Sequence, residues 1–384
     1  MKKVFLILIL LLLVMVKPAM AVYDPTTKQN NIFGIHILFP TELDLAGRLV
    51  NSNGGDWGYI TIPIQYGDRD LVKWQTFMDE AQKDHLIPII RIATEPYYAN
   101  TAVWRKPSDY DILDFANFLN SLNWPTQNRY VLLFNEVNRF DEWGGDAPDP
   151  AEYADFVAYA ADAFKTANPD FFVIAGGFDN AAPNDGVKYV DNLIYLNKMG
   201  QHNPEVFKKI DGLSSHSYPN PNFSEAPSKT KLEGTSTYKY EVDVAEKYAG
   251  HPMPVFITET GWNASVLSGS VISQYFKNVM NDIWGQDPRI IAVTPFILES
   301  GGGPFDKFTF YKGGDFTEYG KAYQGIVKKK GEPELTNYKP IKQVKSKNNE
   351  PMLSTKVGEN SKLIRKLSSS FLATYFKAIF SIGN

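Results

Sequence analysis

Two acidic residues stand directly after apolar runs that are typical of buried strands. Glu136 follows the run at residues 130–134 and one amide, and Glu259 follows the run at residues 254–258. A carboxylate at the tip of a buried strand is costly unless it is paired or used in chemistry. Two such carboxylates across one pocket can break a glycosidic bond, because one protonates the leaving oxygen while the other supports the oxocarbenium-like centre. We therefore predict that Glu136 is the acid/base and Glu259 the nucleophile of one site.

Other residues at or near predicted strand ends are assigned to substrate binding: Arg91, Asn135, His216, Tyr218 and, as a stacking platform, Trp262. Arg91 or the Tyr218 hydroxyl would keep Glu259 ionised, whereas Glu136 opens a long loop and is expected to have a raised pKa. Each assignment has a structural alternative. The acids and the arginine could form ordinary ion pairs, the asparagine could form a turn, and the histidine could be a satisfied polar group.

The elements that would position these residues alternate between strand and helix along the chain. Strands are predicted at residues 32–38, 57–64, 86–92, 130–134, 171–177, 210–218, 254–259 and 290–298. Helices are predicted at residues 41–46, 70–85, 108–122, 150–167, 187–198, 235–248, 271–284 and 316–328. Eight such units predict an α/β protein with a (β/α)8 TIM barrel, whose functional residues gather at the carboxyl ends of the strands. A doubly wound sheet is disfavoured because no glycine-rich phosphate loop follows an early strand.

Composition excludes several classes of function. The formal net charge is -4, so no overall basic character favours a nucleic-acid partner. The absence of cysteine excludes disulfides and thiolate metal sites. The five histidines are scattered without a metal-binding spacing, so no metal or other cofactor is predicted.

The two ends of the chain differ from the predicted barrel. Lys2 and Lys3 precede an apolar run at residues 4–16 and the small residues Ala19 and Ala21, which is typical of a secretory signal peptide at residues 1–21. We therefore expect a secreted or cell-envelope protein with its catalytic barrel at residues 22–334. Residues 335–361 are polar and rich in lysine, which predicts a linker or disordered tail. Residues 362–384 are amphipathic and predict a membrane-surface helix or docking segment. The alternative is the start of a further module or a helix that packs on the barrel.

The motifs resemble those of clan A, a superfamily of retaining glycoside hydrolases with this barrel. The resemblance covers roughly residues 32–330 and rests on Asn135-Glu136-Val137-Asn138, on residues 258–262 (Thr-Glu-Thr-Gly-Trp), and on Arg91, His216 and Tyr218. It implies that Asn135 binds the sugar 2-hydroxyl and that Tyr218 contacts Glu259. One position departs from the clan, which usually has a tryptophan platform after strand eight. Residues 296–303 contain no tryptophan, so Trp262 or Phe305 would have to substitute.

These observations predict a secreted retaining glycoside hydrolase that cleaves an oligo- or polysaccharide by two-glutamate double displacement. The alternative is a non-catalytic carbohydrate-binding or scaffold barrel at the cell surface. A screen for bond cleavage separates the two.

Overall fold

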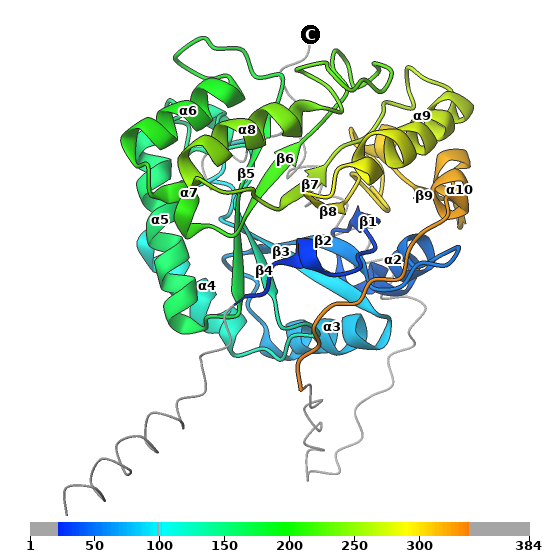
Figure 1. The fold of residues 1–384 in the computed structure, drawn as a ribbon, viewed down its shortest axis with the longest axis horizontal. Helices are drawn as coiled ribbons and strands as arrows, with labels where there is room; N and C mark the ends of the chain where they lie inside the picture. Colours follow the sequence, from blue (N-terminus) through cyan, green and yellow to red (C-terminus); the bar gives the residue numbers. More distant parts are fainter. Residues whose placement is uncertain (1–21, 98–99, 101, 338–384) are drawn as a thin grey trace, which may run out of the picture.

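The computed structural model describes residues 22–97, 100 and 102–337, and these residues form an eight-stranded parallel sheet wrapped in helices (Figure 1). The strands lie side by side in chain order, each next to the one that follows it in sequence. Their bounds are β1 Gly34–His36, β2 Gly58–Gln65, β3 Leu86–Ala93, β4 Arg129–Leu133, β5 Phe171–Asp179, β6 Gly212–His216, β7 Val255–Glu259 and β8 Ile290–Val293. All eight coincide with predicted strands.

The sheet closes on itself where the first strand meets the last. The backbone N–H of Val293 donates to the carbonyl of Ile32 at 2.8 Å, and the N–H of His36 donates to the carbonyl of Pro295 at 3.0 Å. Phe33 and Val293 form a parallel bridge at the same seam. The predicted (β/α)8 TIM barrel is therefore confirmed.

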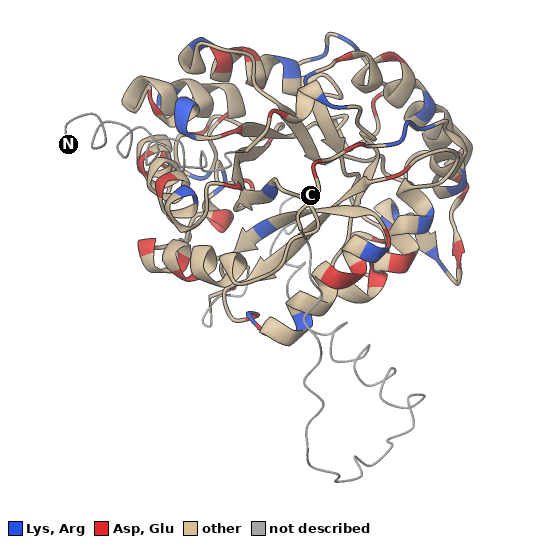
Figure 2. Cartoon of the chain, turned by 60° about the horizontal axis from the view of Figure 1, so that its bottom comes forward, with Lys and Arg blue, Asp and Glu red and all other residues tan. Residues whose placement is uncertain are grey.

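Helices cover the outside of the barrel (Figure 1). Their bounds are α2 Leu43–Val50, α3 Leu71–Lys83, α4 Asp109–Asn120, α5 Pro150–Ala167, α6 Asn192–His202, α7 Val206–Lys209, α8 Thr237–Ala249, α9 Gly269–Asp282 and α10 Glu318–Gly325. The short helix α7 and a small hairpin, β9 Tyr311–Lys312 with β10 Asp315–Phe316, were not predicted. Acidic and basic residues are interspersed along the outer helices (Figure 2).

The interior of the barrel is filled by side chains from alternate strand positions. On β4, Tyr130 and Leu132 belong to the interior cluster, whereas Val131 and Leu133 pack against the helices. The Tyr130 ring lies 5.0 Å from that of Phe172 and 5.6 Å from that of Phe256, measured between ring centroids. Such a filled core leaves the carboxyl-end mouth as the place for a site.

The chain still packs against the barrel just beyond residue 334, where the catalytic domain was predicted to end. Leu335 forms an antiparallel bridge with Thr126, and the Thr336 hydroxyl donates to the carbonyl of Trp124. The predicted signal peptide, residues 1–21, lies outside the described residues. So do residues 338–384, which include most of the predicted linker and the whole amphipathic tail. Among the described helices, none combines the length and apolar character that a membrane span requires.

Glu42 binds the backbone of the segment that follows β1. Its ionisation should make the stability of the fold depend on pH. It is buried, and its carboxylate accepts the N–H groups of Leu38 at 2.7 Å and Phe39 at 2.8 Å. Burial raises the pKa of Glu42 from 4.5 to about 8. Between these two values the folded state keeps a proton that the unfolded state loses, so the free energy of unfolding falls as pH rises, by about 1.4 kcal/mol per unit.

We therefore expect Glu42→Gln to reduce the loss of melting temperature between pH 5 and pH 8.5, because glutamine keeps an acceptor oxygen but does not titrate. Thermal unfolding of the wild type and the variant across this range measures the effect. Glu80→Gln, at an exposed position of α3, is the matched control and should follow the wild type. Parallel curves for wild type and Glu42→Gln would contradict the assignment.

Candidate active site

A cleft of about 490 Å³ opens at the carboxyl ends of the strands. The chain segments that follow β1 and β4 to β8 contribute to its wall, and β3 contributes Arg91 from within the strand. Five predicted site residues line it: Arg91, Asn135, Glu136, Tyr218 and Glu259. A sixth, His216, is buried and hydrogen-bonded to one of these carboxylates. The barrel thus brings together residues that are separated by up to 168 positions in the chain.

Glu259 ends β7 and is held from two sides. An Arg91 guanidinium nitrogen donates to Oε1 at 3.0 Å, and the Tyr218 hydroxyl donates to Oε2 at 3.1 Å. His36, fully buried at the end of β1, places Nδ1 3.7 Å from Oε1. Burial lowers the pKa of His36 well below 6.5, and the charge of Arg91 adds to this effect, so this imidazole is neutral. Arg91 therefore supplies a positive charge in direct contact with the Glu259 carboxyl.

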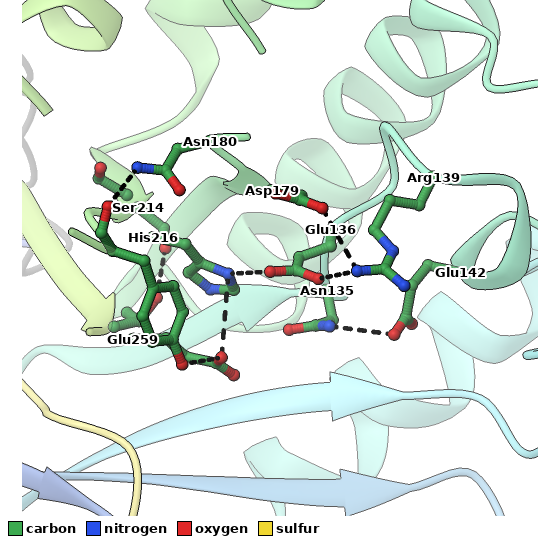
Figure 3. Close-up of polar contacts among 12 residues, drawn as sticks. Asn135, Glu136, Arg139, Glu142, Asp179, Asn180, Ser214, His216 and Glu259 are labelled. Carbon is green, nitrogen blue, oxygen red and sulfur yellow. Dashed lines mark hydrogen bonds and ion pairs between the residues drawn. The ribbon is translucent and has the colours of Figure 1, made fainter. Parts of the chain in front are cut away.

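Glu136 sits on an unusual backbone just beyond β4. Phe134 has φ 64° and Glu136 has φ 37°, values that L-residues rarely adopt and that often mark functional sites. The N–H of Glu136 donates to the carbonyl of Gly177 at 2.9 Å, which fixes this bend against the end of β5. The Glu136 carboxylate contacts His216 Nδ1 at 3.0 Å through Oε1 and Arg139 at 3.3 Å through Oε2 (Figure 3).

His216 reaches Glu136 because β5 carries glycine beside it. A Cβ atom on Gly177 would lie 2.9 Å from His216 Nε2 and 3.0 Å from the Ser214 hydroxyl oxygen. The backbone of Gly177 also has φ 72°, which a side chain would disfavour. This glycine is thus required for the imidazole to pack between the two acids.

The expected raised pKa of Glu136 is not what the structure shows. Burial raises the pKa of Glu136, but the His216 hydrogen bond and the Arg139 charge outweigh it, so the pKa is lowered from 4.5. Burial lowers the pKa of His216, yet Glu259 and Glu136 together raise it from 6.5. In the free protein the geometry therefore favours an ionised Glu136 paired with a protonated His216. The expectation was wrong because Arg139 and His216 approach Glu136 only in the folded chain.

The two candidate acids meet in a small space. Glu136, His216 and Glu259 each offer one ligand atom, and these three atoms lie within 4.8 Å of one another. Such a trio has metal-binding donor types. However, each carboxylate already pairs with a guanidinium group, at 3.0 Å for Arg91 and 3.3 Å for Arg139, and this positive charge disfavours an added cation. The arrangement is better suited to acid–base and nucleophilic chemistry.

Arg139 and Asn138 are site residues that the sequence analysis did not assign. Arg139 binds Asp141 through two nitrogens, at 3.1 and 2.9 Å. It shares a third nitrogen between Glu136 and Asp179, each at 3.3 Å (Figure 3). Asn138 donates to the carbonyl of Asp179 at 3.0 Å and accepts the Asp179 N–H at 3.0 Å. The second asparagine of the motif therefore joins the segments after β4 and β5. Its spacing from Glu136 was visible in the sequence, but its partner was not.

Asp179 lies beside this arginine at the cleft wall. Burial raises the pKa of Asp179 to about 6, and the nearby charge of Glu136 adds to the effect. The cleft thus contains a second titrating carboxyl next to Glu136.

Trp262 is the predicted site residue that the structure places elsewhere. Its side chain is 1% exposed, its ring lies 4.8 Å from that of Phe276 on α9, and its Nε1 donates to the carbonyl of Glu225 at 2.8 Å. It packs under the mouth and does not belong to the cleft wall. Phe296 and Phe305 do line the cleft, with ring centroids 5.0 Å apart. Of the two predicted substitutes for the missing tryptophan, only Phe305 is therefore placed to contact a ligand.

Comparison with known proteins supports the barrel. No family model and no curated protein matches the sequence. Among solved structures, a family 39 glycoside hydrolase from the gut symbiont Bacteroides cellulosilyticus WH2 matches with a TM-score of 0.54 and 17% identity, over 79% of this chain and 64% of that chain. This chain thus spans just under two thirds of that protein. A GH128 (subgroup II) endo-β-1,3-glucanase from Pseudomonas viridiflava gives 0.50, 12% identity, and 78% and 99% coverage.

Fungal β-1,4-galactanases are also similar, with a TM-score of 0.52, 12% identity, and coverage of 76% of this chain and 99% of theirs. At these identities the shared property is the fold.

Proposed function

We propose that the protein is a retaining glycoside hydrolase in which Glu259 is the nucleophile and Glu136 the acid/base. The observation that carries this proposal is the meeting of both carboxylates, from β4 and β7, within 4.8 Å at one cleft. Carboxyl groups about 5–5.5 Å apart suit retention of anomeric configuration, whereas inversion needs about 6.5–9.5 Å to admit a water. The close approach in this cleft favours retention.

In the first step, Glu259 attacks the anomeric carbon and forms a glycosyl ester while the bond to the leaving oxygen breaks. Arg91 and the Tyr218 hydroxyl hold the attacking carboxylate in place. His216, one hydrogen bond away at 3.0 Å, first passes its proton to the ionised Glu136. Glu136 then delivers this proton to the leaving oxygen and is again a carboxylate. In the second step, Glu136 takes a proton from water, which then attacks the same carbon and releases Glu259.

The cleft wall combines aromatic and amide side chains, which suits a carbohydrate. Phe223, Phe296 and Phe305 offer apolar faces, and Asn220 and Asn263 offer polar groups. The similar solved structures include proteins named for β-1,3-glucan and β-1,4-galactan cleavage. We therefore propose a β-linked oligo- or polysaccharide as the substrate class.

The experiment is a substrate panel with the full chain. β-1,3-glucan, β-1,4-galactan and other β-glycans, together with aryl β-glycosides, are incubated with the protein, and new reducing ends are measured. Proton NMR of the first product identifies its anomer. We expect release of new ends from at least one member, with the β anomer formed first. Release of the α anomer first would contradict the retaining mechanism.

A second candidate function is a non-catalytic carbohydrate-binding barrel. The observation that favours it is the lowered pKa of Glu136, which the His216 hydrogen bond and the charge of Arg139 cause against the effect of burial. An ionised Glu136 accepts hydrogen bonds from sugar hydroxyls but donates no proton. Calorimetric binding of an oligosaccharide, without any new reducing ends, would favour this candidate.

Export through residues 1–21 remains a proposal that the sequence pattern supports. Amino-terminal sequencing of protein from the native host tests it, with a start at residue 22 expected. The membrane-surface contact of residues 362–384 likewise stays a prediction.

A further inference from the structure

Glu142 stands at the far end of a hydrogen-bonded chain that begins at the proposed nucleophile. Arg91 donates to Glu259 at 3.0 Å, and a nitrogen of the same guanidinium donates to Oδ1 of Asn135. The Asn135 Nδ2 donates in turn to Oε1 of Glu142 at 3.1 Å (Figure 3). The chain therefore passes from the nucleophile through an arginine and an amide to a second glutamate.

Glu142 lies outside the substrate cleft. Its carboxyl borders a separate cavity of about 20 Å³, which has room for about one water molecule. Arg91 and Asn135 belong to the walls of both spaces, and Thr94, Trp104 and Arg105 are among the other residues that line the smaller one. A side chain on this far wall acts on a substrate only through its neighbours.

We propose that Glu142 is a positioning residue that fixes the side-chain amide of Asn135 in one orientation. This inference rests on the proposed function and on the expectation from the sequence that Asn135 binds the sugar. An amide has one acceptor end and one donor end. Flipping it would put an N–H against the guanidinium of Arg91 and a carbonyl against the carboxyl of Glu142. The contact with Arg91, which carries donors only, would lose its hydrogen bond, so Arg91 sets which end of the amide faces it and Glu142 accepts the N–H at the other end.

The orientation of the Asn135 amide determines which hydrogen-bond donor faces the cleft. The Asn135 amide nitrogen carries two N–H groups, and one of them is bound by Glu142. The other remains for the cleft, which Asn135 lines. A fixed donor at this place recognises a sugar hydroxyl without a reorganisation cost.

The protonation state of Glu142 should make the contact between Glu142 and Asn135 depend on pH. Burial raises the pKa of Glu142 to about 8, and the charge of Asp141 adds to the effect. Glu142 is therefore neutral at pH 7 and ionises as the solution becomes alkaline. The charged groups near it belong to β3, to the β3–α4 segment and to its own segment, and they are Arg91, Arg105, Glu136, Arg139 and Asp141.

The first test is a double-mutant cycle on kcat/KM. Glu142→Gln keeps an acceptor oxygen and should stay within about threefold of the wild type, whereas Glu142→Ala leaves the amide unsupported and should lose about tenfold or more. In an Asn135→Ala background, Glu142→Ala should cost nothing further, because the residue that it positions is gone. Losses that multiply in the double variant would overturn the proposal.

The second test does not need turnover, so it separates a failure of this inference from a failure of the proposed function. Asparagine side chains are labelled with 15N, and the Asn135 amide signals are assigned by their loss in Asn135→Ala. In the wild type these signals should shift with a midpoint near the pKa of Glu142, about 8. In Glu142→Gln they should not respond in this range.

The matched control is Glu95→Gln. Glu95 pairs at 2.8 Å with Arg105, which lines the same small cavity, but it is not part of the hydrogen-bonded chain. This variant should retain the alkaline shift of the Asn135 signals. A wild-type amide that does not respond, or a response that persists in Glu142→Gln, would overturn the proposal.

Discussion

Replacing Glu259 with glutamine should abolish turnover while leaving the barrel folded. The amide has nearly the shape of the carboxylate and can still accept from Arg91, but it cannot attack the anomeric carbon. We expect a fall in kcat of about 10⁴-fold or more, as is usual when a covalent nucleophile is removed. Initial rates on the best substrate of the panel measure this, and the melting temperature reports the fold.

Glu225→Gln is the matched control, because Glu225 stands exposed near the same mouth but outside the cleft wall. It should retain wild-type turnover. Glu259→Ala adds a test of role, since azide can occupy the vacated space and attack in place of the carboxylate. The glycosyl azide should then have the anomeric configuration opposite to that of the substrate. Undiminished hydrolysis by Glu259→Gln would reject the assignment.

Replacing Glu136 with alanine should penalise substrates according to their leaving group. Glycosides with poor leaving groups need protonation of the departing oxygen, so we expect losses of about 10²–10⁴-fold for these. An activated aryl group departs without protonation, so kcat/KM for these glycosides should fall much less in the first step. Comparison of kcat/KM for a nitrophenyl glycoside and an oligosaccharide measures the difference.

Azide again distinguishes the role of this residue. With Glu136→Ala it should attack the glycosyl ester on Glu259 and give an azide of the same configuration as the substrate. Arg139→Lys is a useful companion variant. The Arg139 charge lowers the pKa of Glu136, but burial raises it. Lysine keeps the charge but loses the two-nitrogen contact with Asp141, so the alkaline limb of the pH profile, which reports the proton on Glu136, should move. Equal losses on both substrate types in Glu136→Ala would count against the acid/base role.

The barrel could be predicted because its strands carry the signal themselves. Each is a short apolar run bounded by turn residues, and the two acids stand at the ends of such runs. Parallel strands in a closed barrel bring those ends together whatever the loops do. Glu136 and Glu259 could therefore be paired from the sequence, even though they lie 123 positions apart in the chain.

The loops carried no comparable signal. Arg139 and Glu142 are polar residues in a polar segment, and only the fold shows that one binds Glu136 while the other binds Asn135. The expected raised pKa of Glu136 was wrong for this reason. Trp262 was misplaced because a tryptophan beside a strand end suits either a sugar platform or the packing of a helix, and here it packs on α9.

Element boundaries were missed where capping decided them. The predicted helix at residues 187–198 begins instead at Asn192, because the Asp191 side chain accepts the N–H groups of Leu193 and Ile194, each at 3.0 Å. The apolar periodicity before this point belongs to a loop that packs against the segment after β4, where the N–H of Val190 donates to the carbonyl of Asn138 at 3.0 Å.

The contacts of Asn138 have a mechanical consequence. Its side-chain amide also donates to the carbonyl of Val190 at 2.9 Å, so one residue clamps both ends of the span between Asp179 and Val190 onto the turn that carries Glu136. This span is therefore held at both of its ends by the same side chain. If the contacts of Asn138 break, the turn that carries Glu136 should be displaced with them. Opening of residues 179–190 and loss of activity should therefore occur as a single cooperative event.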